Sequence, residues 1–400
     1  MMQYRKDEKS GNELSVLGFG CMRFPRAFGA IDMKKTTDMI KLAVESGVNY
    51  FDTAWLYPGS EEALGAVLTA QKLREKVYIA SKLPLIVCKS ADDFDKYFSQ
   101  TLKRLKTDYI DYYLMHMLTD MNSWERLKEL GIEDWIREKK NSGAIKRIGF
   151  SFHGGRDDFL AILAAYDWEF CQIQYNYSDE NYQAGRTGLK AAAEKGIPVI
   201  IMEPLLGGRL VNGLPKAARE IFKKAEGGHS PAAWGLNWLW NQKEVTVVLS
   251  GMSGIKQVEE NIKLAENARA GSLSPAEIAV FDEVKRIFNA SYKVGCTGCG
   301  YCMPCPKGVN IPGCFAAYNT SFAFSYIEGV KQYITGSGAL SRNPHLAGQC
   351  VKCGRCEKHC PQNLKISSLL EDVRARLEPF WLSALLSLAR TALGHRRVRS

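Results

Sequence analysis

The 400-residue sequence predicts a parallel (β/α)8 TIM barrel of the α/β class, followed by a smaller, cysteine-rich and mainly helical domain. Two observations support this prediction. Short apolar runs alternate with amphipathic stretches eight times before residue 275, and eight of the 12 cysteines fall in two short runs near the C-terminus. A chain of this length exceeds what one compact core usually holds, so we expect two domains.

The strand candidates are short runs rich in Val, Ile, Tyr and Phe. Most of them lack strict alternation of apolar and polar residues, as expected for strands buried on both faces of a parallel sheet. A small hairpin is expected before them, over residues 2–16. The candidate strands are residues 17–24, 49–53, 77–81, 109–115, 147–152, 171–175, 198–202 and 245–250.

Helices are predicted between these strands, where apolar residues recur at a spacing of three or four. Ser230 and Pro231 are a suitable N-cap and first-turn pair for one of them. A further helix is expected after the last strand, over residues 274–290. The clearest helical patterns between the strands are residues 37–45, 91–105, 124–139 and 256–268.

An open, doubly wound sheet would also alternate strands with helices. No G-x-G-x-x-G sequence follows the first predicted strand, which argues against a dinucleotide-binding sheet of that kind. We therefore predict a barrel over residues 1–290, the cysteine-rich domain over 291–372 and an apolar, basic tail over 373–400.

The composition is that of an ordinary folded protein, with 46% hydrophobic and 24% charged residues. The formal charge is +10, but no long run of Lys and Arg precedes the last few positions, so nucleic-acid binding is not expected. The first residues do not resemble a signal peptide. Clustered cysteines favour metal binding in a reducing compartment over a secreted disulfide scaffold, which predicts a cytoplasmic protein.

Four polar residues stand at or just beyond the ends of the second, third and fourth predicted strands, where such a barrel places its chemistry. They are Asp52, Tyr57, Lys82 and His116. A tyrosine hydroxyl can protonate the oxyanion formed when hydride attacks a carbonyl, if a nearby ammonium lowers its pKa from about 10. An aspartate would hold that ammonium, and a histidine would orient the substrate oxygen. Each residue alone has a structural explanation, but all four in this order favour a site.

Residues 1–290 resemble the aldo/keto reductase family. The matching pieces are Phe51-Asp52-Thr53-Ala54 with Tyr57, Ser81-Lys82, Met115-His116, Gly149-Phe150-Ser151, Gln172, and Gly251 followed by Glu260-Asn261. The resemblance implies Tyr57 as general acid, Lys82 as the group that tunes its pKa, Asp52 as partner of Lys82, and His116 as the residue that orients substrate. It also implies a small carbonyl substrate and a nicotinamide cofactor, NADP with NAD as the alternative.

The same resemblance implies contacts to the nicotinamide. Ser151 and Gln172 match positions that bind its carboxamide. The aromatic residue that commonly covers the ring is replaced by Met202, which can also cover a ring face.

Contacts to the rest of the cofactor are implied at the final strand. Amides of the loop that begins at Gly251 suit a phosphate. The Lys and Arg that often bind the 2′-phosphate are replaced by Gly251 and Gln257, so Lys256 is the candidate substitute. Glu260 and Asn261 match residues that hold the adenine.

The second cysteine run contains Cys350, Cys353, Cys356 and Cys360, followed by Pro361. This C-x₂-C-x₂-C-x₃-C-P spacing supplies thiolates to a [4Fe–4S] cluster. Zinc is the alternative, because C-x₂-C pairs also bind Zn²⁺, but zinc sites usually use two separated pairs.

The first run contains Cys296, Cys299, Cys302 and Cys305, and its last gap has two residues instead of the usual three. In two-cluster ferredoxins the fourth cysteine of each run binds the other cluster. By that pairing Cys360 completes the first set and Cys305 the second. The short gap leaves Cys314 as a reserve ligand. We expect one cluster from the second run and a second cluster from this one.

The whole chain is thus similar to oxidoreductases that join an aldo/keto reductase barrel to a C-terminal, ferredoxin-like iron–sulfur domain. The sequence Cys-Thr-Gly-Cys-Gly-Tyr-Cys-Met-Pro-Cys-Pro, followed by Gly-Val-Asn-Ile-Pro, is typical of that group. Two loaded clusters would reduce the formal charge to roughly +6.

Three functions follow from these patterns. The main hypothesis is an NAD(P)H-dependent oxidoreductase of a small carbonyl or alcohol. The second is an electron-transfer protein that exchanges electrons with a ferredoxin, flavoprotein or quinone, and the third is a nucleotide-binding redox sensor. The tail over residues 380–393 is too short, and too interrupted by Arg390, to span a bilayer. It is expected to dock as a helix, with contact to a membrane surface as the alternative.

Overall fold

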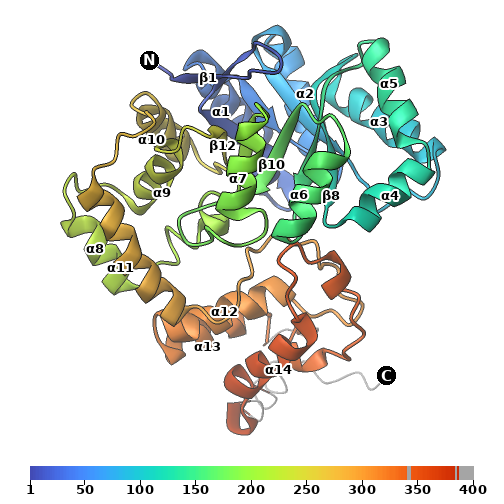
Figure 1. The fold of residues 1–400 in the computed structure, drawn as a ribbon. Helices are drawn as coiled ribbons and strands as arrows, with labels where there is room; N and C mark the ends of the chain where they lie inside the picture. The colour runs from blue at the N-terminus through green and yellow to red at the C-terminus, as the bar shows by residue number, and fades with distance from the viewer. Residues whose placement is uncertain (340–343, 383–384, 387–400) are drawn as a thin grey trace. The chain divides into compact units, whose positions relative to one another are not determined.

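The computed structural model describes residues 1–339, 344–382 and 385–386. The chain forms two compact units (Figure 1). The first comprises Met1–Pro204 and Ala233–Ser274, and the second Leu205–Ala232 and Pro275–Ser400.

The first unit is a closed barrel of eight parallel strands in the order β10-β11-β12-β3-β6-β7-β8-β9. Parallel pairing of β12 with β3 and of β9 with β10 closes the ring, so the barrel prediction is confirmed and the open sheet is wrong. The strands are β3 (Leu17–Gly20), β6 (Tyr50–Asp52), β7 (Tyr78–Leu83), β8 (Ile110–Leu118), β9 (Ile145–Phe152), β10 (Phe170–Gln174), β11 (Val199–Met202) and β12 (Val245–Ser250).

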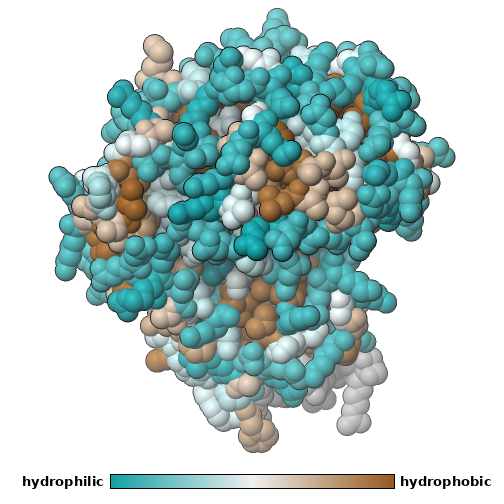
Figure 2. Space-filling view, viewed as in Figure 1, coloured by the Kyte–Doolittle hydropathy of each residue, from teal (hydrophilic) through white to brown (hydrophobic). Residues whose placement is uncertain are grey.

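Helices connect these strands and cover the barrel. Hydrophilic side chains dominate the outer faces of α3, α4 and α5 in Figure 2. The helices are α1 (Met33–Glu45), α2 (Ser60–Ala70), α3 (Asp92–Leu105), α4 (Met121–Glu129), α5 (Ile132–Asn141), α6 (Arg156–Ala165), α7 (Gly185–Glu194), α9 (Pro231–Trp240) and α10 (Ile255–Ala265). The expected hairpin is formed by β1 (Tyr4–Lys6) and β2 (Glu13–Ser15), and a two-stranded ribbon pairs β4 (Arg26–Ala27) with β5 (Ala30–Ile31).

The prediction of a single helix over residues 124–139 is wrong, because two helices occupy this segment. Gly131 has φ of +82°, in the left-handed region that glycine adopts at little cost. Its N–H bonds to Lys128 O at 2.9 Å as α4 ends, and its carbonyl accepts from Trp135 as α5 begins.

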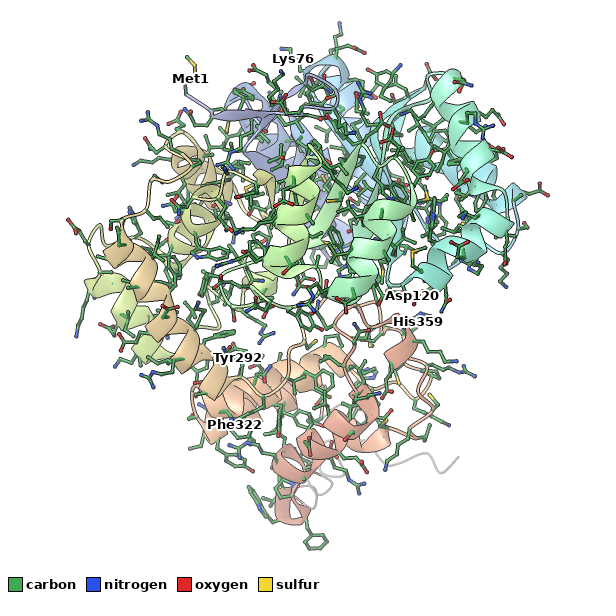
Figure 3. All side chains as sticks on the ribbon, in the orientation of Figure 1. Met1, Lys76, Asp120, Tyr292, Phe322 and His359 are labelled. Carbon is green, nitrogen blue, oxygen red and sulfur yellow. The ribbon has the colours of Figure 1, made fainter. Side chains whose placement is uncertain are left out.

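The second unit is mainly helical, as predicted. It contains α8 (Lys216–Lys224), α11 (Pro275–Ser291), α12 (Ile311–Ala323), α13 (Tyr326–Gly336) and α14 (Ile366–Leu377). Phe222 of α8 packs edge-on against Phe281 of α11, with 5.7 Å between ring centres. The buried Asn319 of α12 accepts from the N–H groups of Lys293 and Val294 at 3.0 and 2.9 Å. These bonds hold the segment just before the first cysteine run against α12. Figure 3 labels Tyr292, which precedes Lys293, and Phe322, which follows Asn319 on the same helix.

The predicted tail helix lies largely outside the described residues, which omit 383–384 and 387–400. Among the residues that the structure does describe, no helix has the length and apolar character needed to cross a bilayer.

Candidate active site and cysteine-lined cavities

The carboxyl end of the barrel gathers the polar residues that the sequence singled out. Side chains two positions apart on a strand point to the same side. The buried cluster inside the barrel includes Tyr50, Ala80, Leu114, Phe170 and Ile200. The residues two positions later therefore face the interior one layer nearer the carboxyl end, and they are Asp52, Lys82, His116, Gln172 and Met202. In Figure 3, Lys76 before β7 and Asp120 after β8 mark the two ends of the barrel.

Asp52 and Lys82 form a buried ion pair. Lys82 Nζ donates to Asp52 Oδ1 at 2.6 Å and to Thr53 O at 2.7 Å, and the lysine is only 1% exposed. Burial lowers the pKa of Lys82 and raises the pKa of Asp52, while their mutual contact opposes both effects. The short contact and the additional carbonyl acceptor hold the ammonium in one position.

Tyr57 lies half-buried in the loop between β6 and α2. Its ring centre is 5.1 Å from Lys82 Nζ, and its ring meets His116 edge-on with 6.0 Å between centres. The structure therefore brings all four predicted catalytic residues, Asp52 included, to one place.

His116 stands in an irregularity of β8, whose register against β9 shifts between Met115 and Leu118. Met117 has φ of +61°, which is unusual for a residue other than glycine, and its N–H donates to Ser151 Oγ at 2.9 Å. Such bulges commonly redirect side chains beside active sites. Burial, with Lys82 and His153 nearby, holds the pKa of His116 well below its ordinary value.

Arg104 of α3 was not identified from the sequence, yet it anchors the loop that carries Tyr57. Its Nη1 donates to Trp55 O at 3.2 Å, and its guanidinium lies 4.8 Å from the Trp55 ring centre. The same group pairs with the fully buried Glu61 at 3.2 Å, and Glu61 accepts from Ser81 Oγ at 2.7 Å. Arg104 thus ties the loop, α2 and the strand of Lys82 together.

Replacing Arg104 with Lys is expected to lower kcat about tenfold with little change in KM for the cofactor. Lysine keeps the charge but loses the planar fork, and small displacements of reacting groups cost rate steeply. Steady-state kinetics measure the effect. Arg74→Lys is the matched control, because Arg74 also pairs with a carboxylate, Asp111 at 2.8 Å, but precedes β7 at the other end of the barrel. An equal loss of kcat in both variants would contradict the anchoring role.

His153 is a second buried histidine at this end of the barrel that the sequence reasoning missed. It follows β9 directly, so the Ser151-Phe152-His153 order at a strand end was the available signal. Burial lowers its pKa to about 4, with the hydrogen bond to Gln183 opposing and the Lys82 charge reinforcing that shift.

His153 should make the stability of the barrel depend on pH. Between its pKa of about 4 in the fold and about 6.5 in the unfolded chain, the unfolded state binds more protons. The free energy of unfolding therefore falls as pH decreases through this window, by on the order of 3 kcal/mol from this residue. His153→Gln should flatten that part of the slope in urea unfolding followed by tryptophan fluorescence. An unchanged slope would show that His153 does not contribute.

The predicted nicotinamide contacts fit a carboxamide. A hydrogen bond from Gln172 helps to offset the raised pKa of Asp52, and a carboxylate only accepts, so the Gln172 amide nitrogen is the donor. Gln172 Oε1 is buried and accepts no hydrogen bond from the described residues, a cost of about 1–3 kcal/mol that a carboxamide N–H would remove. Ser151 Oγ accepts from Met117, which leaves its own proton for a ligand. Met202 packs partly buried at the top of the barrel interior.

The remaining predicted cofactor contacts, on the loop after β12 and on α10, fall into two groups: residues that bond within the loop and residues that are exposed. Asn261 is buried and donates to Ser250 Oγ at 2.9 Å, and Gln257 Oε1 accepts from Ser253 N at 2.8 Å, so both stabilise the loop itself. Gly251 in the loop before α10, and Lys256 and Glu260 on α10, are exposed.

Arg23 is a basic residue at this loop that the sequence reasoning did not identify. A Cβ on Gly251 would stand 3.1 Å from Arg23 Cδ, so the arginine stem lies directly over this glycine. The two residues are distant in sequence, and only the pairing of β3 with β12 brings them together.

The eight clustered cysteines line two separate cavities in the second unit. The first cavity, about 310 Å³ including space open to solvent, is lined by Cys296, Cys299, Cys302 and Cys360. The second, about 330 Å³ on the same measure, is lined by Cys305, Cys350, Cys353 and Cys356. Each set joins three cysteines of one run to the fourth of the other. Ile311 lines both cavities.

The pKa shifts of two thiols agree with this grouping. Burial raises the pKa of Cys302 to about 12, with Cys296, Cys299 and Cys360 adding to the effect. Burial likewise raises the pKa of Cys356 to about 11, with Cys350 and Cys305 among the contributors.

Cys314 lines neither cavity. It is buried in the apolar core of the second unit, with Sγ 3.9 Å from His345 O. Asp, Glu and His are absent from both linings, so the donor set is purely thiol, as a [4Fe–4S] cluster requires.

Two family models match the chain. Residues 16–286 match the model of the aldo/keto reductase family, and residues 295–364 match that of a 4Fe-4S dicluster domain. The first match covers more than half of the 400 residues.

Individual proteins show more distant similarity. Probable aldo-keto reductase 1 of Glycine max is 26% identical over 63% of this chain and 81% of its own length. L-galactose dehydrogenase of Arabidopsis thaliana is 27% identical over 63% and 85%, and L-glyceraldehyde 3-phosphate reductase of Escherichia coli O157:H7 is 24% identical over 70% and 92%. Among solved structures, the holo form of an aldo-keto reductase from Bacillus halodurans has a TM-score of 0.59 and 24% identity over 71% of this chain and 96% of that one, which shows a common fold.

The family model, the closed barrel and the relatives agree with one another. The protein is therefore an oxidoreductase that belongs to the aldo/keto reductase family and carries a 4Fe–4S domain after its barrel.

Proposed function

We propose that the protein reduces a small aldehyde or ketone with NAD(P)H and that Tyr57 is its general acid. One observation carries this proposal: the buried Asp52–Lys82 ion pair lies beside the Tyr57 ring, and His116 meets the same ring from another strand.

The residues act on the proton and the substrate oxygen. The nicotinamide, when bound, supplies hydride to the carbonyl carbon. Tyr57 donates its hydroxyl proton to the oxyanion, and the Lys82 ammonium stabilises the tyrosinate that remains. Asp52 and Thr53 O keep Lys82 charged and in place. His116 is neutral at neutral pH, so it orients the substrate oxygen through a hydrogen bond without adding charge.

NADP is the proposed cofactor, with NAD as the alternative. Lys256 at the start of α10 and Arg23 over Gly251 supply positive charge for an additional phosphate. The oxygen of Gln172 and the hydroxyl of Ser151 would bind the carboxamide.

Initial rates of NADPH and NADH oxidation with a panel of small carbonyls test the proposal. The panel should begin with hydroxylated aldehydes, because two relatives are named for reactions of a sugar and a sugar phosphate. Turnover with a carbonyl and a preference for NADPH are expected. Absence of turnover with every carbonyl would count against the proposal.

We further propose two [4Fe–4S] clusters, one in each cavity, with the fourth cysteine of each run exchanged. Clusters held by these cysteines would supply one-electron chemistry. The match to a dicluster domain and the two four-cysteine cavities also favour a second candidate function, electron transfer to or from another protein. Anaerobic addition of NADPH to reconstituted protein, followed by EPR, tests whether nicotinamide electrons reach the clusters. A reduced-cluster signal is expected only if they do.

A further inference from the structure

The two cavities differ in how far their cysteines reach the surface. Cys353 of the second cavity is exposed, whereas the other seven cysteines of the two sets are only partly so. Val351, which lines the same cavity, is 57% exposed. Three cysteines of each set pack against the apolar core of the unit, so the difference between the cavities lies at Cys353. Electron transfer between proteins falls steeply with distance. The second cavity is therefore the one from which electrons can most readily enter or leave the domain.

The surface around that exposed cysteine is basic. Residues 293–310 and 344–365, which contain both cysteine runs, hold six Lys or Arg and one acidic residue, whereas the whole chain has 53 Lys or Arg and 43 Asp or Glu. We call four exposed basic residues the basic rim: Lys307, Lys352, Arg355 and Lys358. Lys307 lines the second cavity, Lys352 and Arg355 are next in sequence to residues that line it, and Lys358 follows Cys356 by two positions.

Acidic residues offset the basic rim only in part. Glu357 accepts from Ser367 N at 2.7 Å, so its carboxylate caps a neighbouring helix. Glu371 pairs with Lys352 at 2.6 Å, and both side chains are more than half exposed. Two loaded clusters would contribute about −2 each. The four rim side chains are exposed, so they can contact an approaching protein directly.

We infer that the basic rim around Cys353 is the docking face for an acidic, one-electron carrier protein. The inference rests on the proposed cluster in the second cavity. In the transfer step the reduced carrier loses one electron and the oxidised cluster gains it, and no bond to the partner forms. Complementary charge speeds such encounters and makes them sensitive to salt, and weak, small interfaces are typical of electron-transfer pairs.

The test uses the reconstituted full-length protein and an acidic plant-type [2Fe–2S] ferredoxin as the probe. Binding is measured by calorimetry at low and high ionic strength, and carbodiimide cross-links are mapped by mass spectrometry. The variant Lys307→Glu/Arg355→Glu is expected to weaken binding about tenfold or more at low ionic strength. Cross-links are expected at Lys307, Lys352 or Lys358.

Lys365→Glu is the matched control, because Lys365 is exposed and lies between two residues that line the first cavity. It should leave binding nearly unchanged. Equal weakening by Lys365→Glu, salt-independent binding, or tighter rim-dependent binding to phosphatidylglycerol vesicles than to ferredoxin would overturn the inference. Iron analysis of each sample separates these results from failure of the cluster proposal, in which the wild-type second cavity would hold no iron.

Discussion

Replacing Tyr57 with Phe should lower kcat for carbonyl reduction by about 10²–10⁴-fold, the contribution expected of a general acid. The variant removes one hydroxyl and leaves the ring between Lys82 and His116. Cofactor affinity should change little, since none of the groups proposed to bind the nicotinamide is altered. Steady-state kinetics and NADPH titration by protein fluorescence measure the two quantities separately.

Tyr97→Phe is the matched control for this experiment. Tyr97 lies on α3 and packs against Trp55 of the same loop, with 4.8 Å between ring centres, but it is not part of the candidate site. It should retain wild-type activity. Full activity in Tyr57→Phe would exclude Tyr57 as the acid, whereas a loss in both variants would indicate that loop packing dominates.

Exchanging cysteines should show which residues share a cluster. Cys360→Ser is expected to deplete the cluster bound by the first run, although Cys360 belongs to the second run. Cys305→Ser is expected to deplete the cluster bound by the second run, although Cys305 belongs to the first. The double variant Cys296→Ser/Cys360→Ser removes two ligands of one cavity and should leave about half of the iron. Cys305→Ser/Cys360→Ser affects both cavities and should lose nearly all of it.

Iron and sulfide analysis after anaerobic reconstitution measures these outcomes, and EPR identifies the cluster that remains. Cys314→Ser should keep the full iron content, because Cys314 lies outside both cavities. Loss of iron in that variant, or equal iron in the two double variants, would contradict the exchanged pairing.

Much of the barrel could be predicted because its strands carry a clear local signal. A strand buried on both faces is a short apolar run, and all eight such runs form the ring. Parallel strands also place their carboxyl ends on one rim, so residues far apart in sequence, such as Asp52 and His116, could be grouped before their contacts were known.

The remaining features depend on contacts across space. Arg104 gives no local signal, because its role comes from reaching Trp55 and Glu61 on other elements. Arg23 meets Gly251 only through barrel closure. Nothing in the sequence pattern indicated that residues 205–232 would join the second unit, since that segment follows a barrel strand like any other connection.

Because Ile311 lines both cysteine cavities, the number of electrons that the second unit can store depends on both sites together. A hydride carries two electrons, whereas a single [4Fe–4S] centre ordinarily changes by one. Two such centres, in cavities that share Ile311 as a lining residue, would together store two electrons, the number that one hydride carries. The stoichiometry of the two units would then match, electron for electron, even if the clusters exchange those electrons only with an outside carrier.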